Sequence, residues 1–466
     1  MKRKIVIILL AILCVAALAC GLVACNEPDS PKPDNPNTPP NYNPPQSEDT
    51  ELFTYQLTED GSGYVVTGLA EGVTNANITI PATYNGLPVV EIGERAFGSC
   101  NYLTSVTISN GISVIGSGAF TDCVNLPSFK FPDSITTISD SAFQNCSGLR
   151  ALYFNETSKL TAIEANAFQN CTKLSAIVIP DSVETVGDRV FQGCTSLKSV
   201  TLGNGVETIG DETFRGCTTL KTVNIGNSLK HLGTQTFINC TEITELVLPN
   251  SLETVGLGAL KGCTGLKKLS LPFVGSEKYT TPLPEKDEYS PNNHTNFGYI
   301  FGANWFDDHS SVTSDLDNLE TVTITGDSPI GFHAFQGFGR FIDSSETTGI
   351  GLKEIIITGN VKVIGEGAFQ GCHNLQTLLI PKSVTKIGRQ LLDVGVIQHV
   401  YYCGTAADWD KITIYGTDNT KVNSSNNMGL YETVTQSDPK YFYSESAPTT
   451  AGQYWHYVDG VPAPWN

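Results

Sequence analysis

A pattern of apolar residues repeats about every 23 residues along most of the chain. An Ile-Gly type dipeptide marks each repeat, a phenylalanine or leucine usually follows five residues later, and most repeats place a cysteine three residues after that. The eleven markers begin at Ile92, Ile115, Ile138, Ile163, Val186, Ile209, Leu232, Val255, Ile330, Ile364 and Ile387. A fixed period of this length, with apolar residues at constant offsets, predicts a solenoid of stacked coils.

Each repeat divides into short extended pieces joined by turns. Apolar residues in alternation, such as Ile177 and Ile179, predict a strand with one buried face. Proline followed by Asp or Asn, as at residues 180–182, ends that strand. The Ala-Phe-x-x-Cys stretch is too short for a stable helix alone, so we expect one helical or 3₁₀ turn held by packing. Stacked coils would then carry a parallel β-sheet along one side and bury one continuous core.

The repeat unit resembles the BspA-like class of bacterial leucine-rich repeats. Residues 183–187 and 190–194, followed by Leu197 and Val200, carry this resemblance, which covers residues 78–392 in eleven units. The resemblance implies a leucine-rich repeat solenoid on a secreted or surface-displayed bacterial protein. Several members of the family are credited with adhesion to host matrix proteins or to other bacteria. A fold shared by many binding proteins does not name a ligand.

The first 25 residues predict a targeting segment. Residues 2–4 are basic, and residues 5–24 form an uncharged apolar run. Residues 22–25 resemble the lipobox of bacterial lipoproteins, in which cleavage precedes a cysteine that then receives a lipid. We therefore expect an exported, surface-exposed protein that is lipid-anchored to the cell membrane through Cys25. The alternatives are an uncleaved transmembrane anchor or a secretory signal that is cut elsewhere.

The rest of the chain divides by composition. A solenoid needs caps, because its open ends would expose core and unpaired strand edges. We predict a Pro-rich disordered stalk at 26–50, an N-terminal cap and first coil at 51–90, regular repeats at 91–271, an aromatic-rich insertion at 272–318, further repeats at 319–392 and an aromatic-rich C-terminal cap at 393–466. The aromatic residues of the last segment are expected to pack onto the final coil, although they could also form a carbohydrate-stacking surface.

The insertion interrupts the repeat and is the predicted binding site. Its flanking markers Val255 and Ile330 are 75 residues apart, where three regular coils would take 69, and no middle Ala-Phe-x-x-Cys stretch is found. Insertions in solenoids often carry recognition. We predict ligand binding by three aromatic residues in polar surroundings, Tyr279, Tyr289 and Trp305. Three apolar neighbours are instead expected to plug the core, namely Phe297, Ile300 and Phe301.

The row of cysteines predicts buried, reduced thiols. Cys100, Cys123, Cys146, Cys171, Cys194, Cys217, Cys240, Cys263 and Cys372 occupy the same repeat position. Side chains at one position of adjacent coils point the same way, whereas a disulfide needs Cβ atoms that converge. A metal-binding ladder would need histidine or carboxylate partners, which the pattern lacks. We expect these residues to act as small hydrophobic groups.

The net charge and the absence of common catalytic motifs restrict the possible functions of the chain. Forty-seven acidic residues against twenty-eight basic ones give a net charge of −19, which excludes nucleic acid as a partner. No HExxH, GxSxG, GxxxxGK[ST] or EF-hand pattern is present, so we assign no catalytic residue, metal or cofactor. The favoured hypothesis is a monomeric, non-enzymatic module that binds an extracellular protein or glycan. A structural envelope spacer is the alternative, and a glycan-active or proteolytic enzyme comes third.

Overall fold

The structure is a computed structural model. It describes residues 52–279, 296–303, 317–335, 351–370, 372, 374–388, 391, 399–415, 440–444, 454–458 and 461–464. The chain divides into two compact units, Met1–Glu48 and Asp49–Asn466, and all the described residues lie in the second. Cys25 and the predicted stalk therefore lie outside the described residues. Within the part that the structure describes, no helix is long and apolar enough to span a membrane.

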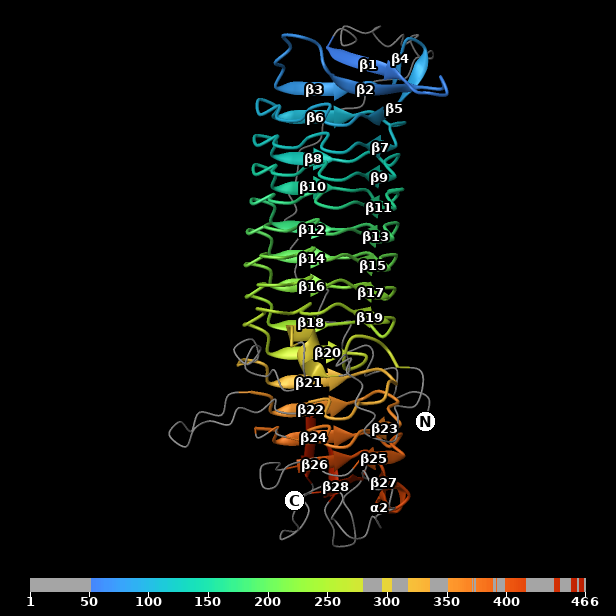
Figure 1. The fold of residues 1–466 in the computed structure, drawn as a ribbon, viewed down its shortest axis with the longest axis vertical. Coiled ribbons are helices and arrows are strands. Elements are labelled where there is room, and N and C mark those ends of the chain that lie inside the picture. Colours follow the sequence, from blue (N-terminus) through green and yellow to red (C-terminus); the bar gives the residue numbers. More distant parts are fainter. Residues whose placement is uncertain are drawn as a thin grey trace, which may run out of the picture. The chain divides into compact units, whose positions relative to one another are not determined.

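The second unit is a solenoid with two ladders of parallel strands, whereas we expected a sheet along one side only (Figure 1). The long-strand ladder consists of β3 (Asn77–Ile80), β6 (Ser105–Ile108), β8 (Ser128–Lys130), β10 (Ala151–Tyr153), β12 (Ala176–Val178), β14 (Ser199–Thr201), β16 (Thr222–Asn224), β18 (Glu245–Val247), β20 (Lys268–Leu271), β21 (Thr321–Ile324), β22 (Glu354–Ile357), β24 (Thr377–Ile380), β26 (His399–Tyr402), β28 (Lys440–Tyr443) and β29 (Tyr454–Val458). Middle residues of these strands pair across coils, as Ile177 does with Val200. The predicted alternation is confirmed, because Ile177 is buried between exposed Ala176 and Val178.

The short-strand ladder forms a second wall of the same coils. It contains β5 (Leu87–Ile92), β7 (Val114–Ile115), β9 (Thr137–Ile138), β11 (Ala162–Ile163), β13 (Thr185–Val186), β15 (Thr208–Ile209), β17 (His231–Leu232) and β19 (Thr254–Val255), and it resumes with β23 (Val363–Ile364), β25 (Lys386–Gly388) and β27 (Thr413–Tyr415). The Ile-Gly markers belong to this ladder. Their apolar residue points into the core, and the residue before it lies on the outer face.

The Ala-Phe-x-x-Cys stretches form hydrogen-bonded turns in place of the expected helical or 3₁₀ turn. In one coil, Ala142 N donates to Ser139 O over 3.2 Å and Cys146 N donates to Phe143 O over 3.2 Å. The third residue of each turn is left-handed, with φ of 56° at Ser141 and 60° at Asn145. This conformation interrupts a helix. It also leaves Phe143 N free to donate to Ala167 O of the next coil over 2.7 Å.

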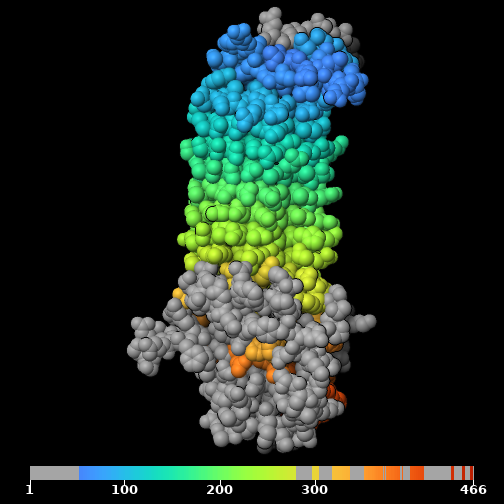
Figure 2. All heavy atoms as spheres, viewed as in Figure 1, coloured from blue at the N-terminus to red at the C-terminus, as the bar shows by residue number. Residues whose placement is uncertain are grey.

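A column of phenylalanine rings runs through the core. Its members are Phe97, Phe120, Phe143, Phe168, Phe191, Phe214 and Phe237, all fully buried. Neighbouring ring centroids are 5.2–5.6 Å apart, and the ring planes lie within 16° of parallel. The column follows from the fixed repeat, because each ring occupies the same place one coil further on. Figure 2 shows the outer atoms of successive coils in level rows on one face of the same array.

Each cysteine beyond the first donates a weak hydrogen bond from its thiol to the preceding coil. The acceptor is the carbonyl oxygen of that coil's phenylalanine, 3.1–3.4 Å from Sγ, for Cys123, Cys146, Cys171, Cys194, Cys217, Cys240, Cys263 and Cys372. These thiols take part in no disulfide and are buried. Cys100 differs from the prediction because it is only partly buried. The coil before it has no Ala-Phe-x-x-Cys stretch to supply a phenylalanine carbonyl. The Sγ of Cys100 lies 3.6 Å from the Tyr102 hydroxyl instead.

The native protein should resist thiol alkylation. Burial raises the pKa of Cys123 to about 12, so almost no reactive thiolate forms at neutral pH. We expect iodoacetamide to label the eight buried thiols only in denaturant, with equal thiol counts before and after reductant. Loss of several thiols without reductant would instead establish disulfides.

Alkaline pH should destabilise the fold through the same thiols. Burial raises the pKa of Cys217 from 9.0 to about 12, so the unfolded thiol ionises first. Its contribution to stability is full below pH 9 and is lost as pH rises toward 12. In urea titrations, Cys217→Ala should make this decline shallower by up to about 1.4 kcal/mol per pH unit. An unchanged slope would contradict the assignment.

Antiparallel hairpins close the two ends of the array. At the N-terminal end, β1 (Phe53–Leu57) pairs with β2 (Tyr64–Leu69), which pairs with β5, while β4 (Thr83–Tyr84) also pairs with β5. Phe53 packs edge-to-face against Phe97, with ring centroids 6.1 Å apart. At the other end, β29 pairs with β30 (Val461–Pro464). These hairpins are the caps that the fold class predicts.

The described aromatic residues of the C-terminal cap pack into the array. Trp409, in helix α2 (Ala406–Trp409), and Trp455 are 2% and 0% exposed. Trp455 Nε1 donates to Tyr402 O over 2.9 Å, and its ring lies 5.3 Å from that of Tyr401. For these residues the packing interpretation is confirmed over the carbohydrate-stacking one.

Candidate functional site

The predicted insertion forms one overlong coil of the solenoid. Strand β20 pairs directly with β21 in parallel, with Lys268 opposite Thr321. The chain therefore makes a single coil step between these two strands. On the other wall, Glu277 forms an isolated bridge with Thr254, and Ile330 forms the next bridge with Ile364. The comparison with three regular coils was wrong, because the chain makes two coil steps between Val255 and Ile330.

A short 3₁₀ helix replaces the missing Ala-Phe-x-x-Cys stretch in this coil. Helix η1 spans Phe297–Phe301, and the Asn296 side chain accepts a hydrogen bond from Tyr299 N at its start. Leu260 N of the preceding coil donates to Ile300 O over 2.8 Å, and Phe297 N donates to Ala334 O over 2.8 Å. The side chains of Phe297, Ile300 and Phe301 are buried, which confirms that they plug the core.

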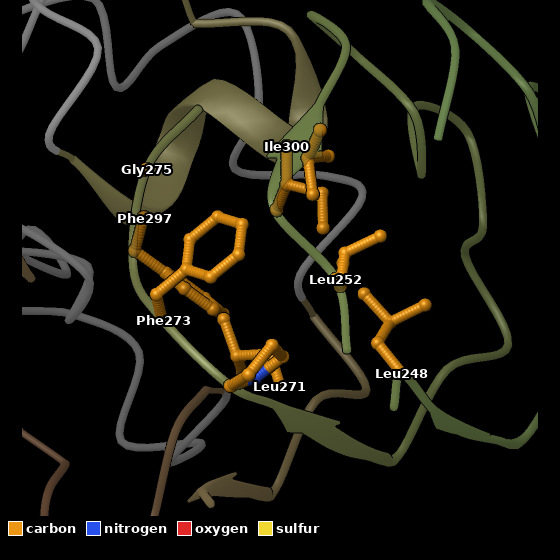
Figure 3. A pocket seen from close by; sticks show the side chains of 9 residues that line it. Leu248, Leu252, Leu271, Phe273, Gly275, Phe297 and Ile300 are labelled. Carbon is orange, nitrogen blue, oxygen red and sulfur yellow. The ribbon is translucent and has the colours of Figure 1, made fainter. Parts of the chain in front are cut away.

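A small cavity remains where the overlong coil meets the regular array (Figure 3). Its volume is about 10 Å³, and its lining includes Leu248, Leu252, Phe273, Phe297 and Ile300. An apolar cavity of this size holds no ligand and offers a water too few polar partners. It is a packing defect caused by the exchange of a turn for a helix.

Of the three predicted binding residues, the structure describes only Tyr279. This tyrosine is half-buried, and its backbone N donates to Ser328 Oγ over 2.9 Å. The Ser328 hydroxyl in turn donates to Tyr279 O over 3.2 Å. Burial, followed by the nearby Glu277 charge, raises the pKa of the Tyr279 hydroxyl. Tyr289 and Trp305 lie outside the described residues.

The overlong coil also breaks the short-strand ladder. Val255 N donates to Ser276 O over 2.7 Å, and Lys278 N donates to Glu253 O over 2.8 Å. The chain therefore runs antiparallel to β19 at this point. Directly paired residues present their side chains on the same face of a sheet. Glu277 thus continues the outer row of the ladder beyond Thr254.

An open groove of about 440 Å³ lies on the outer face at this break. Its polar side chains form one row from Thr208, His231, Thr254 and Glu277, which are paired in succession, and a second group from Asp211, Thr234 and Ser276. Glycines 210, 233 and 256 also line it and contribute backbone alone. His231 Nδ1 lies 2.9 Å from Thr254 Oγ1, which orients the imidazole along the row.

In the second group of polar residues, hydrogen bonds between coils hold Asp211 and Thr234 in place. Asp188 Oδ1 accepts from Asp211 N over 2.8 Å, and Asp211 Oδ1 accepts from Thr234 N over 2.6 Å. No lysine or arginine lines the groove. Among the residues that the structure describes, no group of three or more His, Cys, Asp or Glu side chains could hold a metal ion. The groove therefore offers hydroxyls, an imidazole and carboxylates for hydrogen bonding.

Sequence reasoning missed this groove because its residues come from four coils. His231 stands at a repeat position that the adjacent coils fill with Thr208 and Thr254, so the sequence alone does not distinguish it from an ordinary surface residue. The marker glycines do not single out the groove either, since glycine follows every marker from Val186 to Ile387, both inside and outside the groove.

Comparison with known proteins places the repeat in a family. The model described as BspA type leucine-rich repeat region matches residues 74–195, 161–277 and 341–445. No curated protein matches the chain.

Several solved structures resemble the chain. A leucine-rich repeat protein from T. pallidum is 30% identical, with 42% of this chain and 89% of that chain covered and a TM-score of 0.38. One from Bacteroides ovatus is 24% identical, with 78% and 88% covered and a TM-score of 0.42. A leucine-rich cell surface protein from Faecalibacterium prausnitzii is 22% identical, with 79% and 97% covered and a TM-score of 0.38. Since the family model matches more than half of the sequence, the chain belongs to the BspA-type leucine-rich repeat family.

Proposed function

We propose that this protein is an exported, lipid-anchored module that binds an extracellular protein or glycan, without catalytic activity of its own. Family membership supports a binding role in general. The observation that carries the proposal is a column of exposed apolar side chains on the outer face of the long-strand ladder.

The column consists of Tyr153, Val178 and Val247, which are 56%, 64% and 53% exposed. Each is the last residue of its strand, in β10, β12 and β18, so all three share one outward position of the repeat. Thr201 and Asn224 stand between Val178 and Val247 in the same row. Apolar groups gathered on one wall of a mostly neutral surface favour contact with a partner.

A binding screen tests this proposal. The immobilised protein is exposed to extracellular matrix proteins, bacterial surface extracts and glycans. Replacing Tyr153, Val178 and Val247 together with serine should abolish capture of a protein partner. Val124→Ser is a matched control, because Val124 is also exposed, at 37%, but belongs to none of these strands. If the wild-type protein captures nothing, the spacer hypothesis replaces this one.

The lipid anchor has its own test. Replacing Cys25 with alanine removes the proposed acceptor sulfur and should release the protein from the membrane fraction. The fold should be unchanged, because Cys25 precedes the solenoid unit. Fractionation followed by circular dichroism of the released protein measures both effects. A variant that stays in the membrane would instead support a transmembrane anchor.

A further inference from the structure

We propose that the groove on the short-strand ladder binds a neutral oligosaccharide, which lies along the row from Thr208 to Glu277. This inference rests on the proposed binding function and names a ligand class and a site for it. The site is separate from the apolar column, which belongs to the long-strand ladder.

The charges of the groove exclude anionic ligands. Asp211 and Glu277 line it, and no lysine or arginine does. Phosphate, sulfate and sialic acid groups would meet carboxylates within a chain of net charge −19. A ligand without negative charge is required.

The polar groups of the row suit a polyol. Thr208 and Thr254 carry hydroxyls that can each donate and accept, and Glu277 is an exposed carboxylate that accepts only. Glu277 has no ion-pair partner among the described residues, so both of its oxygens are open to a pair of adjacent sugar hydroxyls. Hydrogen bonds to a charged acceptor are stronger than those between two neutral groups.

The imidazole of His231 is already oriented for such a ligand. Thr254 Oγ1 holds its Nδ1 over 2.9 Å, and Nε2 has no partner within the described part of the chain. Whether Nε2 donates or accepts follows from the tautomer, and a sugar hydroxyl satisfies both cases. Thr254 therefore positions His231 and also lies between it and Glu277.

The spacing of the row suits a linear chain of sugars. Successive residues stand on successive rungs, about 4.8 Å apart, which is close to the length of one pyranose ring. The volume of about 440 Å³ lies within the range of small-ligand sites.

The test uses the full chain in a zwitterionic detergent that carries no sugar. Maltotetraose, cellotetraose and chitotetraose are titrated as neutral probes, and sialyllactose is the anionic probe. We expect at least one neutral probe to bind and sialyllactose not to bind. Glu277→Gln and Thr254→Val should each weaken the bound probe about tenfold.

Thr137→Val is the matched control, because Thr137 occupies the ladder position of Thr254 outside the groove. It should leave affinity unchanged, and circular dichroism checks that all variants fold. The inference is overturned if no neutral probe binds, if only sialyllactose binds, or if both groove variants bind as well as wild type. Capture of a protein partner in the screen, together with no sugar binding, would overturn this inference alone and leave the proposed function standing.

Discussion

Replacing Phe191 with alanine is expected to lower the free energy of unfolding by about 4 kcal/mol. The ring is fully buried and stacks between Phe168 and Phe214, with centroids 5.6 Å away on both sides. Truncation leaves a cavity between two neighbours that are themselves fixed in the column. Because coils contact only their neighbours, this defect should also weaken coupling between the two halves of the array. Urea unfolding followed by circular dichroism measures the loss of unfolding free energy. A broader unfolding transition would show the weaker coupling between the two halves.

The chain itself supplies the control for this change. Leu260 occupies the same repeat position in a later coil and is fully buried. Phe191→Leu should therefore cost only about 1 kcal/mol, since most of the volume is kept. A Phe191→Ala variant as stable as Phe191→Leu would show that the column contributes little to the stability of the array.

The repeating part of the fold was predictable because identical positions recur in identical surroundings. Ile177 and Ile179 are buried as their alternation predicts. A correct structural prediction for one coil therefore holds for its neighbours as well. The second strand ladder was not predicted as such, since each of its strands has only two residues in most coils, too few for a pattern of their own.

The turns were missed for a different reason. Inter-coil hydrogen bonds decide their conformation, and a single coil viewed alone shows none of these bonds. A signal was nevertheless present in the repeat. Asn145 and Asn170 share a position with Gly193 and Gly216, and all four have positive φ. Asparagine and glycine alternating at one position is typical of a left-handed residue.

The candidate site shows the limit of pattern analysis. The predicted plug residues Phe297, Ile300 and Phe301 are buried. The antiparallel pairing of Glu277 with Thr254 was not predicted. The two residues lie one 23-residue period apart, but the period alone does not reveal that the chain direction reverses at Glu277. The groove depends on this pairing, so only the assembled coils show it.

The glycine of the Ile-Gly marker gives the second large prediction. Gly233→Ala should lower the free energy of unfolding by about 3 kcal/mol. A Cβ at this position would lie 2.4 Å from the carbonyl carbon of Gly210 and 2.6 Å from Asp211 N. Both atoms are backbone of the preceding coil, so relief requires the two coils to move apart. That movement would stretch the hydrogen bond from Gly233 N to Ile209 O, now 2.8 Å. Urea unfolding of the variant measures the effect.

Gly216→Asn is the matched control, because it changes a glycine of the adjoining coil at a different kind of position. Gly216 has φ of 72°, and a Cβ there would meet no atom within 4 Å. Asn145, Asn170 and Asn239 adopt a similar φ at the equivalent place. The substitution should shift stability by no more than about 0.5 kcal/mol. If Gly233→Ala loses no more stability than Gly216→Asn, the close approach of the coils does not require glycine at this position. If only Gly233→Ala is destabilised, the marker glycine sets how closely the coils stack.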